Sequence, residues 1–269
     1  MGEPVFEREE VFDRDYLYFY VPIVDGEQAV ESAALLWRLL RLRPAIRVLD
    51  LACGHGRIAN ELAATGACVV GLDREELFLR YAVQAARSRN LLSLPSSQDA
   101  ADSSLNSFSS AVASPAYVQG DMRFLPFSQD FERVVCWFSS FGYFGDEDNR
   151  KVLREVHRSL CPGGLFLLDL QNRERLVGCS LSPLSMENGE DCIVDTRWYD
   201  PMSGRLETTR LVYRGKKQRR VQFSVRLFSF PEIRDWLRHA GFKNVRAVDE
   251  QGGAYDPEKS YRMIVLSEG

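Results

Sequence analysis

Apolar and polar residues follow one another along this chain in a pattern that predicts strands alternating with helices. Short runs rich in apolar residues predict strands at residues 47–51, 67–72, 117–118, 133–138 and 165–170. Apolar residues at helical spacing predict helices at residues 28–42, 57–64, 74–89 and 147–160. Apolar strands separated by helices are typical of a parallel sheet that is covered on both faces.

The pattern changes beyond residue 170, where strands are predicted to follow one another without helices between them. Three antiparallel strands are predicted at residues 192–199, 205–213 and 219–227, joined by the turns DPMSG and RGKK. A capping box formed by Ser229 and Glu232 predicts a helix that ends at Gly241. Two final strands are predicted at residues 244–248 and 261–266.

We therefore expect a single domain over residues 1–269, with three additions to its core. An N-terminal aromatic and helical segment occupies residues 1–44, and an antiparallel lid occupies residues 171–228. The serine-rich stretch 91–115 is too polar to pack, so we interpret it as a loop insertion. It is either a neutral surface loop or a regulatory, phosphorylated segment.

Composition narrows the possible partners. The formal net charge of -4 gives no overall attraction to nucleic acid or to an anionic membrane surface. The six cysteines form no C-x-x-C pair, so we expect reduced cysteines and no metal site. No signal order and no apolar run of about 18 residues is present, which predicts a soluble, cytoplasmic protein. The oligomeric state stays open.

The stretch VLDLACGHGRIA, residues 48–59, combines a predicted strand, a glycine loop and the start of a helix. Gly54 and Gly56 satisfy the dinucleotide fingerprint G-x-G-x-x-G/A, and Asp73 follows Gly54 at the distance of a ribose-binding carboxylate. NAD and S-adenosylmethionine both carry that ribose. Asp50 would repel a pyrophosphate but suits ammonium and sulfonium charges. A cationic nucleoside therefore fits better than a dinucleotide.

Several motifs stand together in one order: VLDLACGHGR, VVGLD, GDMRFLPF, FSSFGYF and LREVHRSLCPGGLFLLDL. In this order and strand context the chain resembles the class I S-adenosylmethionine-dependent methyltransferases, over nearly its whole length. The resemblance implies S-adenosylmethionine as cofactor and a doubly wound, Rossmann-like α/β sheet of seven strands with an antiparallel last strand. The chain looks most like bacterial small-molecule enzymes with an aromatic N-terminal segment and an antiparallel lid. Ala52 departs from the glycine usual in the family and tightens the room beside the methionine moiety.

The ends of the predicted strands supply the candidate cofactor site, because ligands of open α/β sheets lie outside those ends. Asp73 would hold both ribose hydroxyls, and its removal should weaken cofactor binding while leaving stability nearly unchanged. Asp121 would accept from the adenine amino group while Met122 packs beside the ring. The full set of expected cofactor contacts is Tyr16, Tyr20, Asp50, Ala52, Cys53, Gly54, Gly56, Asp73, Arg74, Asp121, Met122, Trp137 and Phe138.

The loop after the fourth strand, SSFGYFGD, lies where a methyl acceptor must sit. We expect Phe141, Tyr143 and Phe144 to wall the acceptor, with core packing as the alternative for each. Tyr143 is the candidate catalytic residue, orienting the acceptor through its hydroxyl. The three histidines are poor catalytic candidates. The basic run at residues 214–220 is interpreted as a solvated loop, or as a contact for an acidic substrate.

These observations predict methyl transfer to an oxygen or nitrogen of a small-molecule metabolite. Three alternatives stay open: a cofactor-binding scaffold or cyclase of the same fold that does not methylate, an NAD-dependent oxidoreductase, and a nucleic-acid methyltransferase. The acidic balance and the absence of an NPPY-like clamp disfavour the last of these.

Overall fold

The computed structural model describes residues 11–92, 114–179 and 181–269. The N-terminal part of the segment 1–44 and most of the predicted insertion 91–115 lie outside the described residues. The helices are α2 (Arg14–Val24), α3 (Glu27–Leu39), α4 (Arg57–Ala64), α5 (Glu76–Ser88), α6 (Asp146–Ser159), α7 (Arg173–Gly178) and α8 (Phe230–His239). Among the described residues, every helix is too short or too polar to cross a membrane.

A seven-stranded sheet forms the centre of the molecule, in the order β10-β11-β5-β4-β1-β2-β3. Its strands are β1 (Arg47–Leu51), β2 (Cys68–Asp73), β3 (Ala116–Gln119), β4 (Phe131–Cys136), β5 (Leu160–Gln171), β10 (Lys243–Val248) and β11 (Arg262–Glu268). Strands β1 to β5 run parallel, whereas β11 is antiparallel to both of its neighbours. The predicted Rossmann-like fold with an antiparallel last strand is confirmed.

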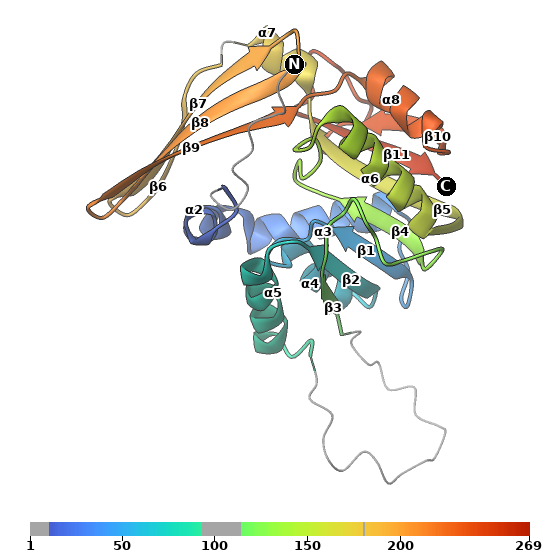
Figure 1. Ribbon diagram of the computed structural model, residues 1–269. Helices are drawn as coiled ribbons and strands as arrows, with labels where there is room; N and C mark the ends of the chain where they lie inside the picture. The colour runs from blue at the N-terminus through green and yellow to red at the C-terminus, as the bar shows by residue number, and fades with distance from the viewer. Residues whose placement is uncertain (1–10, 93–113, 180) are drawn as a thin grey trace.

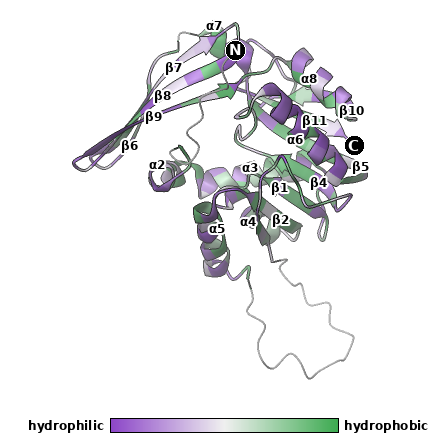
Figure 2. Ribbon diagram, viewed as in Figure 1, coloured by the Kyte–Doolittle hydropathy of each residue, from purple (hydrophilic) through white to green (hydrophobic). Residues whose placement is uncertain are grey.

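Helices cover both faces of this sheet (Figure 1). Neighbouring residues of a strand point to opposite faces, so Val48 packs with α3 and α4 while Leu49 packs with α6 and α8. Figure 2 shows the hydrophobic residues concentrated in central strands such as β1 and β4. The two cores hold the strands rigidly, which fixes the positions of the residues at the strand ends.

A separate four-stranded antiparallel sheet, here called the lid sheet, stands outside the first sheet and close to α2 (Figure 1). It consists of β6 (Leu184–Asn188), β7 (Asp191–Asp200), β8 (Arg205–Arg214) and β9 (Lys217–Arg226). Three of these strands were predicted. The edge strand β6 was missed because its sequence, LSMEN, is short, has no buried residue and lacks a clear alternation of apolar and polar residues.

Helix α2 is attached to the lid sheet by ion pairs. Arg214 contacts Asp15 at 2.7 Å, and Arg219 contacts Asp13 at 2.5 Å and Asp15 at 2.9 Å. These arginines belong to the basic run 214–220, which was interpreted as a solvated loop or as a contact for an acidic substrate. Instead, part of the run holds the N-terminal helix of the same chain.

Candidate active site

Two cavities meet at the carboxyl ends of the central strands. The strand-end cavity, of about 1020 Å³, is lined by residues that follow β1, β2, β3 and β4. The lid cavity, of about 880 Å³, lies between those strand ends and the lid sheet. Five residues line both cavities: Phe12, Tyr16, Phe138, Ser140 and Tyr143. These shared walls define the place where ligands in the two cavities would meet.

The carboxylate of Asp73 organises the glycine loop. It accepts hydrogen bonds from the backbone N–H groups of Gly54, at 2.7 Å, and of Glu75, at 2.9 Å. Burial raises the pKa of Asp73, although these backbone hydrogen bonds oppose the rise. A carboxylate has further lone pairs, so Asp73 can also accept hydrogen bonds from hydroxyl groups in the cavity.

Asp50 is a buried carboxylate with an oxygen to spare. Its side chain is 2 % exposed, and Oδ2 has no hydrogen-bond partner among the described residues. Burial raises the pKa of Asp50 to about 7, and the nearby Arg57 guanidinium limits the rise. Leaving a buried carboxylate oxygen unpaired is costly, so this site is suited to a cationic ligand group.

Left-handed backbone conformations shape the loops around the strand-end cavity. Gly56 has φ +77°, and an added Cβ would lie 2.5 Å from the Tyr117 hydroxyl and 2.6 Å from the Ala82 Cβ. Ala52 also has a positive φ, of 57°, which costs a residue with a Cβ more than glycine. The alanine is therefore accommodated with backbone strain at the position where the resemblance implies glycine.

Asp121 is already engaged within the protein. It accepts hydrogen bonds from the Arg123 guanidinium, at 2.7 Å from Nη2 and 3.0 Å from Nε. Partial burial would raise the pKa of Asp121, but these bonds outweigh it and lower the pKa. The carboxylate stays ionised at the cavity wall and keeps lone pairs for an amino group.

Three partly buried tyrosines, Tyr16, Tyr20 and Tyr143, cluster where the cavities meet. The rings of Tyr16 and Tyr20 stack at 4.2 Å between centroids. Burial raises the pKa of Tyr16, of Tyr20 and of Tyr143, and the nearby Tyr20 phenol raises the pKa of Tyr16 and of Tyr143 further. All three are therefore neutral hydroxyls at physiological pH.

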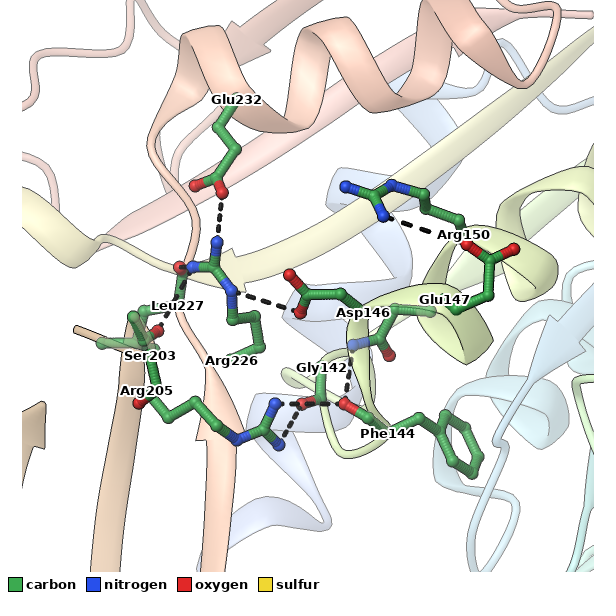
Figure 3. Close-up of polar contacts among 12 residues, drawn as sticks. Gly142, Phe144, Asp146, Glu147, Arg150, Ser203, Arg205, Arg226, Leu227 and Glu232 are labelled. Atoms are coloured by element: carbon green, nitrogen blue, oxygen red, sulfur yellow. Dashed lines mark hydrogen bonds and ion pairs between the residues drawn. The ribbon is translucent and has the colours of Figure 1, made fainter. Parts of the chain in front are cut away.

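The lid sheet holds the loop that carries Tyr143 (Figure 3). The Arg205 guanidinium donates to the carbonyl oxygens of Gly142 and Phe144, both at 3.1 Å. The backbone N–H of Arg226 also donates to the Gly142 carbonyl, at 2.8 Å, and the Arg226 side chain pairs with Glu232. Tyr143 is thus flanked by two carbonyls that the lid sheet positions.

The structure brings most of the predicted cofactor residues together. The strand-end cavity is lined by eleven of them: Tyr16, Asp50, Ala52, Cys53, Gly54, Asp73, Arg74, Asp121, Met122, Trp137 and Phe138. Tyr20 lines only the lid cavity, and Gly56 acts through loop geometry without lining either cavity.

The predicted acceptor wall is only partly assembled. Tyr143 lines both cavities and Phe144 lines the strand-end cavity, but Phe141 does neither. Phe141 is 2 % exposed and packs against Phe228 in the core, with ring centroids 5.6 Å apart. The positive φ values of Phe138 and Ser139 turn the chain sharply after β4, which directs Phe141 inward.

Sequence reasoning missed several residues around the cavities. Asp169 is buried at the end of β5, where its carboxylate accepts from the Phe138 backbone N–H at 2.7 Å and pairs with Arg262 at 2.5 Å. A lone aspartate in the apolar run LFLLDL is the signal that would have found it. Phe12 and Phe78 also line the strand-end cavity, and no motif marks them.

Comparisons with known proteins agree with this geometry. Residues 49–168 match the family model described as a methyltransferase domain. The chain is 26% identical over 161 residues to glycine N-methyltransferase of Rattus norvegicus, covering 58% of this chain and 50% of that protein. It is 27% identical over 227 residues to the putative methyltransferase YqeM of Bacillus subtilis (strain 168), covering 81% of this chain and 82% of that one. The chain thus spans half the length of the rat protein.

Two solved structures share the fold. One is an S-adenosylmethionine-dependent methyltransferase from Clostridium acetobutylicum ATCC 824, with a TM-score of 0.70 and 17% identity over 94% of this chain and 95% of that one. The other is the sugar N-methyltransferase KedS8 from Streptoalloteichus sp ATCC 53650, with a TM-score of 0.65 and 17% identity over 100% and 97%. Residues 49–168 thus match a methyltransferase domain family, and the chain as a whole shares its fold with S-adenosylmethionine-dependent methyltransferases. S-adenosylmethionine is the cofactor of that family.

Proposed function

We propose that this protein transfers a methyl group from S-adenosylmethionine to the nitrogen of a small-molecule acceptor. The observation that carries the proposal is the junction of two cavities at Tyr16, Phe138 and Tyr143. One cavity has the carboxylates that suit a cationic nucleoside, and the other opens toward the lid sheet. Such an arrangement would bring a donor and an acceptor against each other, and alignment supplies much of the acceleration in methyl transfer.

The residues of the strand-end cavity fit the cofactor. The unpartnered Oδ2 of Asp50 is suited to the ammonium group of the methionine moiety. Asp73 would accept from the ribose hydroxyls, and Asp121 from the adenine amino group beside Met122. When bound, S-adenosylmethionine supplies a methyl carbon that is activated by a positively charged sulfur. Phe12, Tyr16 and Tyr143 would shield this carbon from water.

Nitrogen is favoured over oxygen as the methyl acceptor because the described residues that line both cavities offer no general base. Its tyrosines have raised pKa values, so a phenolate of Tyr143 is not available near neutral pH. His55 contacts Asp25 and lines the strand-end cavity but not the lid cavity, so it does not lie at the junction. A neutral amine carries its own lone pair and needs no base for attack, whereas most hydroxyl acceptors must lose a proton. Tyr143 would then orient the amine through a neutral hydroxyl.

The named functions of relatives support this choice of atom. The rat relative is named a glycine N-methyltransferase, and one structure of the same fold is named a sugar N-methyltransferase. Both names refer to nitrogen in a small molecule. Their acceptors differ, so the acceptor of this chain is a separate question.

Calorimetry and isotope transfer together test the proposal. S-adenosylmethionine and its demethylated product, S-adenosylhomocysteine, should bind at micromolar concentration, whereas NADH should not. Protein incubated with methyl-labelled cofactor and a metabolite extract should yield a labelled small molecule whose label resides on nitrogen. Binding of NADH alone would overturn the cofactor, and cofactor binding without any labelled product would favour a scaffold that does not methylate.

A further inference from the structure

One face of the lid sheet lines the lid cavity. Part of this face carries charged residues, and the other part carries apolar residues. Alternate residues of a strand share a face, so Asp195 and Arg197 of β7 point the same way. The strand register places them opposite Arg210 and Thr208 of β8, and Thr208 in turn lies opposite Phe223 of β9. All five residues line the lid cavity.

Two of the arginines in the cavity wall are neutralised by carboxylates. Arg210 donates to both oxygens of Asp195, at 2.8 Å and 2.7 Å, and the pair is almost fully buried. Arg262 pairs in the same way with Asp169, at 2.8 Å and 2.5 Å. Because a carboxylate compensates the positive charge of each of these guanidinium groups, neither is expected to pair strongly with a ligand carboxylate.

Arg197 is different, because it has no carboxylate partner among the described residues. Within the described part of the chain, its Nη2 donates a hydrogen bond of 3.3 Å to the Ser182 carbonyl oxygen, and its buried Nε has no partner. The side-chain oxygen of Gln171 in the same cavity wall is also buried without a partner. Buried polar groups are normally paired, so these two atoms indicate that the cavity is built for a polar ligand.

We infer that the lid cavity binds the acceptor through a carboxylate that pairs with Arg197, an inference that rests on the proposed N-methyl transfer. One unmatched guanidinium matches one negative charge, and its fork of N–H donors matches the geometry of a carboxylate. A neutral hydroxyl in the same place would leave the positive charge uncompensated. The acceptor is therefore a small amine that also carries a carboxylate, as an amino acid does.

The apolar side of the lid face defines the remainder of the acceptor. Leu206, Phe223 and Val225 line the cavity beside the charged residues. Tyr143 and Tyr16 close the cavity at the junction, where the amine must lie. The acceptor therefore lies with its carboxylate toward β7, its amine at the junction and an apolar body against β8 and β9.

A matched pair of probes tests this assignment without any methyl transfer. Protein saturated with S-adenosylhomocysteine is titrated with phenylacetate and with phenylacetamide, which have nearly the same shape and differ in charge. Phenylacetate should bind at least about tenfold more tightly, because only the carboxylate pairs with Arg197. The variant Arg197→Gln should lose this preference, and Arg197→Lys should keep part of it.

Arg220→Gln is the control, because Arg220 is exposed on β9 and lies on the opposite face from Val221 and Phe223. It should leave the preference unchanged. Equal binding of the two probes by the wild-type protein would overturn the inference without any reliance on a folded variant. Tighter binding of phenyl phosphate than of phenylacetate would replace the carboxylate by a phosphate. Failure of S-adenosylhomocysteine to bind would instead count against the proposed function.

Discussion

The Asp73 carboxylate holds the backbone N–H of Gly54 at 2.7 Å and so ties the end of β2 to the glycine loop after β1. A second hydrogen bond joins the same carboxylate to the Glu75 N–H. The premise of the expectation that Asp73 contributes little to stability is therefore wrong. It treated the residue as a carboxylate facing an empty cavity, whereas the side chain is only 9 % exposed and has two backbone partners.

We predict that Asp73→Ala lowers both cofactor affinity and stability. Cofactor affinity should fall at least about tenfold, because the ribose contacts are lost and the glycine loop loosens. The free energy of unfolding without ligand should fall by about 1 to 3 kcal/mol, since the Gly54 and Glu75 N–H groups lose their acceptor. Calorimetry with S-adenosylhomocysteine and denaturant unfolding measure the two effects.

Asp73→Asn is the matched control, because it keeps the size of the side chain and one acceptor oxygen. It should lie between wild type and Asp73→Ala in both measurements. Wild-type affinity in the alanine variant would show that Asp73 does not hold the ribose. Wild-type stability would show that the two backbone hydrogen bonds do not matter for folding.

We predict that cofactor binding depends on pH around pH 7, because the Asp50 carboxyl titrates there. Burial raises the pKa of this carboxyl to about 7, and only its ionised form can pair with a cationic group. Affinity for S-adenosylhomocysteine, which retains the ammonium group, should therefore rise with pH through 7 and be about tenfold lower at pH 6 than its plateau. Titration calorimetry between pH 5.5 and 8 measures this. A flat profile would contradict the assignment.

The stability of the ligand-free protein should depend on Asp50 in the opposite sense. The folded-state pKa lies above the usual value of 3.8, so the folded state binds the proton more tightly and loses stability as pH rises from about 4 through 7. Asp50→Asn, which mimics the protonated carboxyl, should raise the melting temperature relative to wild type at pH 8 more than at pH 5. The same variant should weaken cofactor binding at pH 8.

Site residues at the ends of strands could be predicted from the sequence, whereas site residues in the loop after β4 could not all be placed. Asp50, Asp73 and Asp121 were found from the sequence because parallel strands bring their carboxyl ends to one edge of the sheet, whatever the loops do. Phe141 was misplaced because consecutive left-handed residues turn the chain after β4, and sequence does not mark Phe138 and Ser139 for that conformation.

The lid cavity was harder to predict from sequence. The pairing of Asp195 with Arg210 depends on the exact register of β7 and β8. A shift of one residue would move the side chains of one strand to the other face of the sheet. The role of Tyr20 depends further on α2 lying against the lid sheet, where its hydroxyl accepts from Arg210 at 2.8 Å. Contacts between distant segments of this kind have no local sequence signal.

Arg205 should act as a positioning residue for the loop that carries Tyr143. Arg205→Met removes the donors to the Gly142 and Phe144 carbonyls and leaves both buried oxygens with fewer partners. Backbone amides of residues 141–145 should then exchange with deuterium faster, while those of the glycine loop at residues 54–57 change little. Arg205→Lys should restore part of the protection. Equal acceleration in both loops would indicate general destabilisation instead of a local role.

Asp13 is the N-cap residue of α2 and also forms an ion pair with the lid sheet. Two substitutions can separate the capping role from the ion pair. Its carboxylate accepts from the Asp15 and Tyr16 N–H groups, at 2.9 Å and 3.0 Å, and also pairs with Arg219. Asp13→Asn keeps an N-cap and loses the charge, whereas Asp13→Ala loses both. An N-cap contributes about 1 kcal/mol, while a partly exposed ion pair contributes at most about 1 kcal/mol and often nothing.

Because Tyr16 lies in the first turn of α2 and lines both cavities, Asp13→Ala should weaken S-adenosylhomocysteine binding up to about fivefold. Asp13→Asn should bind it with nearly the affinity of the wild type. Calorimetry on the two variants at low and high salt measures the difference, and equal losses in both would assign the effect to the ion pair in place of the cap.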